Sequence, residues 1–154
     1  MSGQPEAALA EHVAAHPDVS RWCVAYSGGM DSHVLLHLAA ELLGTDDAVR
    51  LRAVHVDHGL SSGSGSWARH ARTVAESLGV PLRVRRVQVR RNGDGPEAAA
   101  RQARYAAFAE ELEPGEHLLL AQHADDQAET FLLQALRGSG PDGLAGIPRR
   151  RPFA

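Results

Sequence analysis

The segment Cys23–Ser32, CVAYSGGMDS, places two glycines and a carboxylate where a short apolar run gives way to a helical pattern. The run before Ser27 indicates a buried strand, and the apolar periodicity of residues 31–43 indicates a helix. Glycines at such a junction let backbone N–H groups turn inward, and the helix start adds positive potential, so the segment predicts an anion-binding loop. No lysine follows, which excludes the Gly-x-x-x-x-Gly-Lys loop. A tight turn capped by Asp31 or Ser32 is the alternative.

Outward from this segment, the sequence predicts a polar leader over residues 1–20, with a short helix around Ala7–Ala15, and then four strands alternating with four helices. Such alternation is typical of an α/β fold with a mainly parallel sheet and helices on both faces, where ligands bind beyond the carboxyl ends of the strands. The third strand breaks its alternation at Arg85-Arg86, which predicts an edge position or a bulge. We expect strands at 21–27, 49–58, 82–89 and 117–123, helices at 31–43, 96–112 and 124–138, a loop at 59–66, and a helix whose one face carries Trp67, Ala71, Val74 and Leu78.

The composition sets limits on function. The 154 residues suffice for one domain, and a net charge of −3 means that a nucleic-acid partner would need a local basic patch. Cys23 is the only cysteine, which excludes an internal disulfide or a cysteine-rich metal site and fits a reducing cytoplasm. We identify no secretion signal and no apolar run long enough to span a membrane. The candidate basic patches are Arg83, Arg85, Arg86, Arg90 and Arg91, and then Arg149, Arg150 and Arg151.

An acidic cluster follows the fourth predicted strand, in QHADDQAET. Asp125 and Asp126 lie four and three residues before Glu129, so all three converge on one side of a helix. Carboxylates at a helix start can simply complement its dipole. Beside the glycine loop at the same edge of the predicted sheet, they would instead suit a metal–nucleotide site.

The helix that begins EAAARQARYAAF carries Glu97, Arg101, Arg104 and Phe108 along one stripe. Glu97 and Arg101 could form an ordinary surface ion pair, or the arginines could neutralise phosphate charge. We expect Tyr105 and Phe108 to be core residues rather than platforms for base stacking. In HVDH, His55 and His58 bracket Asp57, but this spacing scatters their side chains and argues against a zinc site.

Several motifs together identify a family. Ser27–Ser32 resembles the Ser-Gly-Gly-x-Asp-Ser signature of the ATP pyrophosphatase superfamily. With HVDHGLS, EAAARQARYAAF and LLAQHADDQAETFLLQALRGSGPDGLAGIP, the chain resembles the tRNA(Ile)-lysidine synthases. The resemblance implies a Rossmann-like PP-loop fold of the adenine-nucleotide α-hydrolase type over residues 21–154, truncated at its C-terminus relative to family members. It also implies ligation of lysine to C2 of the wobble cytidine of tRNA(Ile) with a CAU anticodon, through an adenylated intermediate, with release of AMP and pyrophosphate.

The resemblance further implies a set of site residues. Asp31 would contact Mg²⁺, and Asp31, Asp126 and Glu129 would serve catalysis together with two arginines near the reacting centre. Gln122 stands where many relatives have a histidine, so the role of that histidine does not transfer. The implied partners are the tRNA and L-lysine, with no membrane, and a homodimer is left open. The residues implied to bind ATP are Ser27, Gly28, Gly29, Met30, Asp31, Ser32, His55 and Asp57. The two arginines implied in catalysis are Arg101 and Arg104. The residues implied to contact lysine or tRNA are His123, Asp125, Arg137, Gly138 and Ser139.

Two other functions remain as alternatives. A related PP-loop tRNA thiolase would need catalytic cysteines, commonly a Cys-x-x-Cys pair, and this chain has only Cys23. A non-catalytic adenine-nucleotide-binding module would need the glycine loop but has no use for the acidic cluster or the paired arginines.

Overall fold

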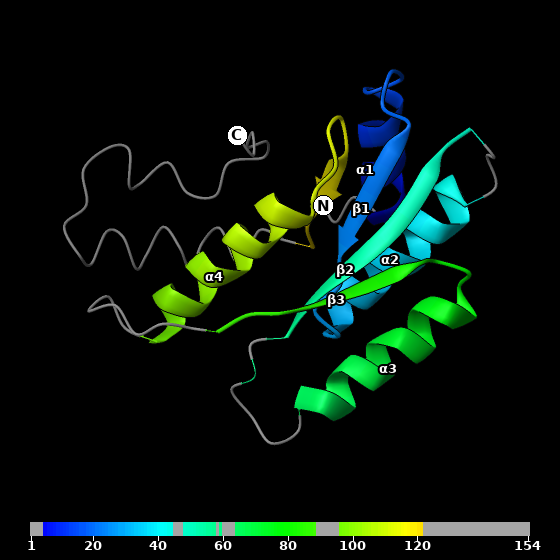
Figure 1. Ribbon diagram of the computed structural model, residues 1–154. Coiled ribbons are helices and arrows are strands. Elements are labelled where there is room, and N and C mark those ends of the chain that lie inside the picture. Colours follow the sequence, from blue (N-terminus) through cyan, green and yellow to red (C-terminus); the bar gives the residue numbers. More distant parts are fainter. Residues whose placement is uncertain (1–4, 45–47, 58, 60–63, 89–95, 122–154) are drawn as a thin grey trace, which may run out of the picture. The chain divides into compact units, whose positions relative to one another are not determined.

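The computed structural model describes residues 5–44, 48–57, 59, 64–88 and 96–121, which carry all the elements of Figure 1. The chain divides into two compact units, Met1–Leu120 and Ala121–Ala154, and every described helix and strand lies in the first. Strand and helix alternate after the first helix, as the sequence predicts. The elements are α1 (Pro5–Ala14), β1 (Arg21–Ala25), α2 (Met30–Leu43), β2 (Arg50–Asp57), α3 (Ser64–Ser77), β3 (Leu82–Arg86), α4 (Pro96–Glu111) and β4 (His117–Leu119).

The four strands form one sheet in the order β3-β2-β1-β4, and every neighbouring pair is parallel. The predicted α/β class is therefore confirmed. The order changes direction at β1, because β2 and β3 lie on one side of it and β4 on the other. In an open parallel sheet such a switch point leaves a crevice beyond the carboxyl ends, where ligands bind. The glycine loop follows β1 at this point.

One face of the sheet buries its apolar side chains against α1, α2 and α3. Trp22 and Val24, which alternate along β1, pack in one cluster with Leu36 of α2 and Ala71 of α3. Burial of a side chain of this size contributes about 1.5–3 kcal/mol. Leu9 of α1 belongs to the same cluster, so the predicted polar leader contributes an apolar side chain to the core.

The other face is covered by α4, which Figure 1 shows on the opposite side of the sheet from α1 and α2. Cys23 and Val54, which point away from the first cluster, are buried on this face, as is Phe108 of α4. Arg52 of β2 reaches the end of α4 and donates to the Glu111 carbonyl at 2.7 Å. The prediction of helices on both faces is thus confirmed.

Most element bounds lie within two residues of the sequence-based expectations, and larger differences occur at three places. Helix α3 begins at Ser64, so Ser64–Ser66 are helical rather than part of the predicted loop. Strand β3 ends at Arg86 and pairs continuously with β2 from Leu82 onward, so the edge position is confirmed and no bulge is formed in that stretch. Strand β4 ends at Leu119, before the predicted end at residue 123. The predicted helix at 124–138 lies outside the described residues.

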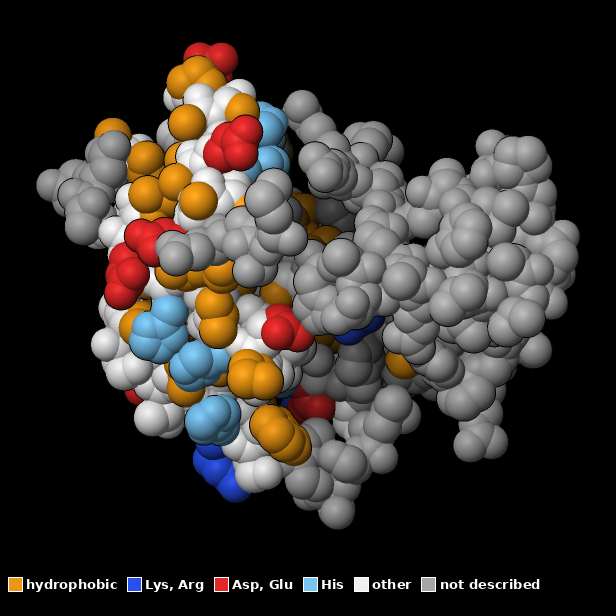
Figure 2. All heavy atoms as spheres, turned by 180° about the vertical axis from the view of Figure 1, so that it is seen from behind, with side chains coloured by type: hydrophobic (Ala, Val, Ile, Leu, Met, Phe, Trp, Pro, Cys, Tyr) orange, Lys and Arg blue, Asp and Glu red, His pale blue; other side chains and the backbone are white. Residues whose placement is uncertain are grey.

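The rear view in Figure 2 shows histidine side chains lying among hydrophobic ones on the described surface. On α2, the His33 and His37 rings lie 4.9 Å apart between their centroids, and Val34 and Leu42 are exposed. Exposed apolar side chains of this kind are ordinary on a globular surface. Across the described part of the chain, no helix has the length and hydropathy required to cross a membrane.

Candidate functional site

The glycine loop links Tyr26, just after β1, to the start of α2 at Met30. Gly28 has φ +86°, a left-handed conformation that glycine adopts freely and other residues avoid. Gly29 is the N-cap of α2, and no side-chain hydrogen bond caps it. The alternative of a turn capped by Asp31 or Ser32 is therefore wrong, because both residues lie inside the helix. A helix start of this kind directs the positive end of its dipole at the loop, which favours an anion.

Two serines hold the loop in shape from inside. Ser32 is only 4% exposed, and its Oγ accepts a hydrogen bond from the Ser27 backbone N–H at 3.2 Å. The same hydroxyl donates to the Gly29 carbonyl at 3.0 Å and lies 2.9 Å from the Ser27 hydroxyl. The Gly29 N–H donates to the Ser27 Oγ at 3.3 Å. A loop fixed in this way binds a ligand with little further loss of conformational entropy.

Asp31 is exposed in the first turn of α2, two residues after Gly29. Magnesium is usually bound through one or two carboxylates together with phosphate oxygens and water, without a complete cage of protein ligands. Within the described ranges, no group of three or more His, Cys, Asp or Glu side chains could hold a metal by itself. A single exposed carboxylate beside this loop would therefore be sufficient on the protein side for the predicted magnesium contact of Asp31, which stays a prediction.

The end of β2 brings His55 and Asp57 to the same edge of the sheet, and both are buried. The His55 Nδ1 donates to the Tyr26 carbonyl at 2.8 Å, because a carbonyl can only accept, and this bond ties β2 to the residue before Ser27. Asp57 accepts from the Gly59 N–H at 2.9 Å through Oδ1, and its Oδ2 lies 3.5 Å from the Arg86 Nε. These two predicted ATP-binding residues thus shape the edge beside the glycine loop. His58 lies outside the described residues.

Trp67 lies beside the glycine loop, and the spacing of apolar residues in the sequence did not predict this position. The spacing placed it on one helix face with Ala71, yet Trp67 is 55% exposed while Ala71 is fully buried. A Cβ added to Gly28 would lie 3.5 Å from the Trp67 Cε3. The indole therefore flanks the loop from the start of α3. The signal in the sequence was a tryptophan at the beginning of a helix that follows a strand's carboxyl end.

The two predicted arginines of α4, Arg101 and Arg104, lie in the middle of the helix. Arg101 is exposed, and its guanidinium carbon lies 5.6 Å from the centroid of the Tyr105 ring, a cation–π distance. Arg104 and Tyr105 are partly buried, whereas Phe108 is 2% exposed and confirms its prediction as a core residue. The stripe therefore passes from the core at Phe108 to solvent at Arg101. The side chain of Glu97, and with it the predicted ion pair, lies outside the described residues.

The structure thus brings the glycine loop, the end of β2 and the start of α3 together at one edge of the sheet. The predicted acidic cluster and the predicted lysine or tRNA contacts fall outside the described residues, so their place relative to the loop stays a prediction. These residues are His123, Asp125, Asp126, Glu129, Arg137, Gly138 and Ser139.

Cys23 is fully buried in β1. Burial raises the pKa of its thiol to about 12, an effect larger than the opposing influence of the nearby Arg52 charge. A thiol of this kind stays protonated at neutral pH and is a poor nucleophile. The only cysteine of the chain is therefore a structural residue.

A family model described as a PP-loop domain matches residues 4–154. Curated proteins named tRNA(Ile)-lysidine synthase are similar to the chain. The one from Alkalilimnicola ehrlichii is 58% identical over 146 residues, which are 94% of this chain and 33% of that protein. The one from Pseudomonas aeruginosa is 50% identical over 148 residues, which are 96% of this chain and 33% of that protein. The chain spans about a third of the length of these relatives.

A solved structure of similar fold is the U34-tRNA thiolase NcsA from Methanococcus maripaludis, described with its [4Fe-4S] cluster. It aligns with a TM-score of 0.64 and 18% sequence identity, covering 80% of this chain and 46% of that chain. At this identity the likeness concerns the fold alone.

Proposed function

The chain belongs to the PP-loop domain family, and from this premise we propose that it takes part in the ATP-dependent ligation of lysine to the wobble cytidine of a tRNA(Ile) with a CAU anticodon. The observation that carries the proposal is the 58% identity to a protein named tRNA(Ile)-lysidine synthase over 94% of the chain. The glycine loop supports it, because its left-handed Gly28 and uncapped α2 start suit the phosphates of ATP.

In the proposed reaction, the C2 carbonyl oxygen of the cytidine attacks the α-phosphorus of ATP, and pyrophosphate leaves. The ε-amine of lysine then attacks C2, a proton is lost from nitrogen, and AMP leaves with the oxygen. Activation of this kind replaces one difficult substitution with two easier steps. The product carries the lysine nitrogen on C2 in place of the oxygen.

The predicted site residues have separate roles in this proposal. The Gly28 N–H and the first N–H groups of α2 would bind the phosphates, and Ser32 would keep the loop backbone in its binding shape. Asp31 would hold the magnesium ion, which neutralises phosphate charge when it is bound. Arg101 and Arg104 would stabilise the charge that develops on the transferred phosphoryl group. Asp125, Asp126 and Glu129 are proposed to receive the lysine or to assist catalysis.

Sulfur transfer, the activity in the name of the similar thiolase structure, is not favoured for this chain. Its only cysteine, Cys23, is fully buried within β1, and burial raises the pKa of that thiol to about 12. The proposed reaction needs no cysteine. We also place the activity in the cytoplasm, where a reduced Cys23 and a supply of ATP and tRNA are expected.

The test is incorporation of radiolabelled lysine into a tRNA(Ile) transcript with the CAU anticodon, in the presence of Mg-ATP and the protein. A transcript with uridine in place of the wobble cytidine is the matched control. Label on the cytidine transcript alone supports the proposal. No label on it, or equal label on both transcripts, contradicts the proposal.

A further inference from the structure

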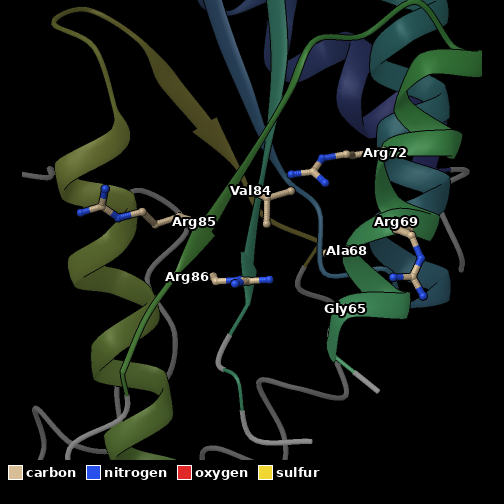
Figure 3. Close-up of a pocket in the computed structure, with 7 residues that line it drawn as sticks. All are labelled: Gly65, Ala68, Arg69, Arg72, Val84, Arg85 and Arg86. Carbon is tan, nitrogen blue, oxygen red and sulfur yellow. The ribbon is translucent and has the colours of Figure 1, made fainter. Parts of the chain in front are cut away.

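We propose that the groove between α3 and β3 binds the sugar–phosphate backbone of the RNA substrate, an inference that rests on the proposed function. The groove has a volume of about 630 Å³ and is lined by Gly65, Ala68, Arg69, Arg72, Val84 and Arg86, together with part of Arg85 (Figure 3). This volume is within the range of about 300–1,000 Å³ typical of ligand sites. Such sites are mostly apolar, however, whereas guanidinium groups dominate this lining.

The alternation of β3 sorts its arginines between the two faces of the sheet. Arg83 and Arg85 turn toward α4, where Arg83 lies 3.3 Å from Glu111 and Arg85 pairs with Glu110. Figure 3 shows the Arg85 guanidinium directed to the α4 side, whereas Arg86 extends on the side of α3. The basic patch predicted from the sequence is therefore divided. Arg83 and Arg85 have their charge neutralised by glutamates on the α4 face.

Two arginines of α3 supply the positive charge that the sequence patch did not include. Arg72 points across the groove toward β3, and Arg69 lies one turn earlier beside Gly65 (Figure 3). Neither has a carboxylate within ion-pair distance in the described part of the chain. The Arg86 side chain is 82% exposed. Its Nε lies 3.5 Å from Oδ2 of the buried Asp57, with which it forms an ion pair. In a chain of net charge −3, Arg69 and Arg72 are therefore two neighbouring cations with no paired carboxylate among the described residues, and Arg86 beside them is paired with Asp57 alone.

The position of the groove favours RNA backbone as its occupant. Helix α3 starts at the carboxyl edge of the sheet, where Trp67 flanks Gly28 of the glycine loop. Phosphates held by α3 would therefore lie beside the site proposed to bind ATP. The planar guanidinium fork matches phosphate oxygens in pairs, and phosphate contacts fix the register of a nucleic acid on a protein. Gly65 has no side chain and Ala68 has only a methyl group, which leaves the groove accessible at this end.

The test compares the affinity of a fluorescently labelled tRNA(Ile) CAU transcript for three forms of the protein by anisotropy. The forms are wild type, Arg69→Gln/Arg72→Gln, and the control Arg21→Gln/Arg50→Gln. The control removes the same charge from the opposite end of the sheet, where Arg21 and Arg50 are register partners on β1 and β2. Glutamine keeps good helix propensity in α3, so the fold should be retained, and thermal unfolding checks this.

We expect Arg69→Gln/Arg72→Gln to raise the dissociation constant for the transcript roughly 10-fold to 50-fold at about 0.1 M salt. The slope of log affinity against log salt should become shallower by about 0.7–0.9 for each arginine removed. The control should stay within about twofold of wild type, and the affinity for Mg-ATP should not change in either variant.

Three results would overturn the inference: no binding of the transcript to wild type, unchanged affinity in the α3 variant, or an equal loss in the control. A loss of Mg-ATP affinity with unchanged RNA affinity would assign the groove to nucleotide phosphates instead. Lysine incorporation by wild type separates this inference from the proposed function. If wild type modifies the transcript and the α3 variant binds it normally, only the groove assignment fails.

Discussion

The indole of Trp67 flanks Gly28, with its Cε3 3.5 Å from the position that a Gly28 Cβ would occupy. This relationship joins the start of α3 to the loop between β1 and α2, two segments about 40 residues apart in the sequence. It also places an exposed aromatic ring at the proposed phosphate site. The ring can therefore report on the loop.

The fluorescence of Trp67 should change when Mg-ATP binds, because the indole lies against the loop and is 55% exposed. Trp22, the other tryptophan, is 1% exposed in the core and should not respond. Titration with Mg-ATP should thus give a saturable change in wild type and none in Trp67→Phe. A change of equal size in Trp67→Phe would show that the signal does not come from the loop.

Gly28→Ala should weaken Mg-ATP binding, because alanine at φ +86° is strained and the loop would shift to relieve it. The matched control is Gly79→Ala, since Gly79 has φ +67°, follows α3, and has open space where a Cβ would lie. Each variant should lose about 1–2 kcal/mol of unfolding free energy, measured by urea denaturation. Only Gly28→Ala should lower the affinity in calorimetry. Equal affinities in the two variants would argue against a binding role for the loop.

The fold was predictable because its signals are local. Glycines after an apolar strand, a helical stripe after them, and regular alternation of elements led to the parallel sheet and to β3 at its edge. The first and last residues of helices and strands were less predictable where tertiary contacts determine them. Ser64–Ser66 read as a flexible loop because serine and glycine are poor helix formers, yet they begin α3.

Glu116→Gln should lower the unfolding free energy by about 1.5–3 kcal/mol, because it weakens two charge-assisted hydrogen bonds of a partly buried ion pair. The Glu116 carboxylate, 3% exposed, accepts from the Nε and Nη2 of Arg52, each at 2.6 Å. The exposed pair Arg21–Glu113, at 3.4 Å, is the comparison, and Arg21→Gln should cost at most about 1 kcal/mol. Chemical denaturation measures both. Similar losses in the two variants would contradict the assignment of Arg52–Glu116 as the stronger pair.

Stability should fall as the pH rises from about 9 to 12, because burial raises the pKa of the Cys23 thiol from its usual 9.0 to about 12. In this window the unfolded chain loses the thiol proton and the folded chain keeps it, so unfolding becomes more favourable by up to about 1.4 kcal/mol per pH unit. Below pH 9 both states keep the proton and the effect is absent.

The check on this dependence is urea denaturation across pH 8–11 for wild type and Cys23→Ala. The slope of stability against pH should be smaller in the variant. Part of the slope should remain, because burial also raises the pKa of Tyr26. A slope that is identical in the two proteins would contradict the role of Cys23.

The site was less predictable than the fold, because side-chain direction depends on packing. The pattern did place Ser27–Ser32 correctly at the start of a helix. It did not reveal that Ser32 faces the inside of the loop, that His55 bonds to the Tyr26 carbonyl, or that Trp67 flanks Gly28. It also grouped Arg83 and Arg85 with Arg86, although the pleat of β3 directs them to opposite faces.

The measurement that tests the central claim most directly is the fate of ATP labelled at its α-phosphate, followed by chromatography with lysine and the CAU transcript present. The account predicts labelled AMP in wild type, formed only with the transcript, and at least about tenfold less in Asp31→Asn, which removes the proposed magnesium contact. Labelled ADP, or AMP formed equally without the transcript, would contradict it.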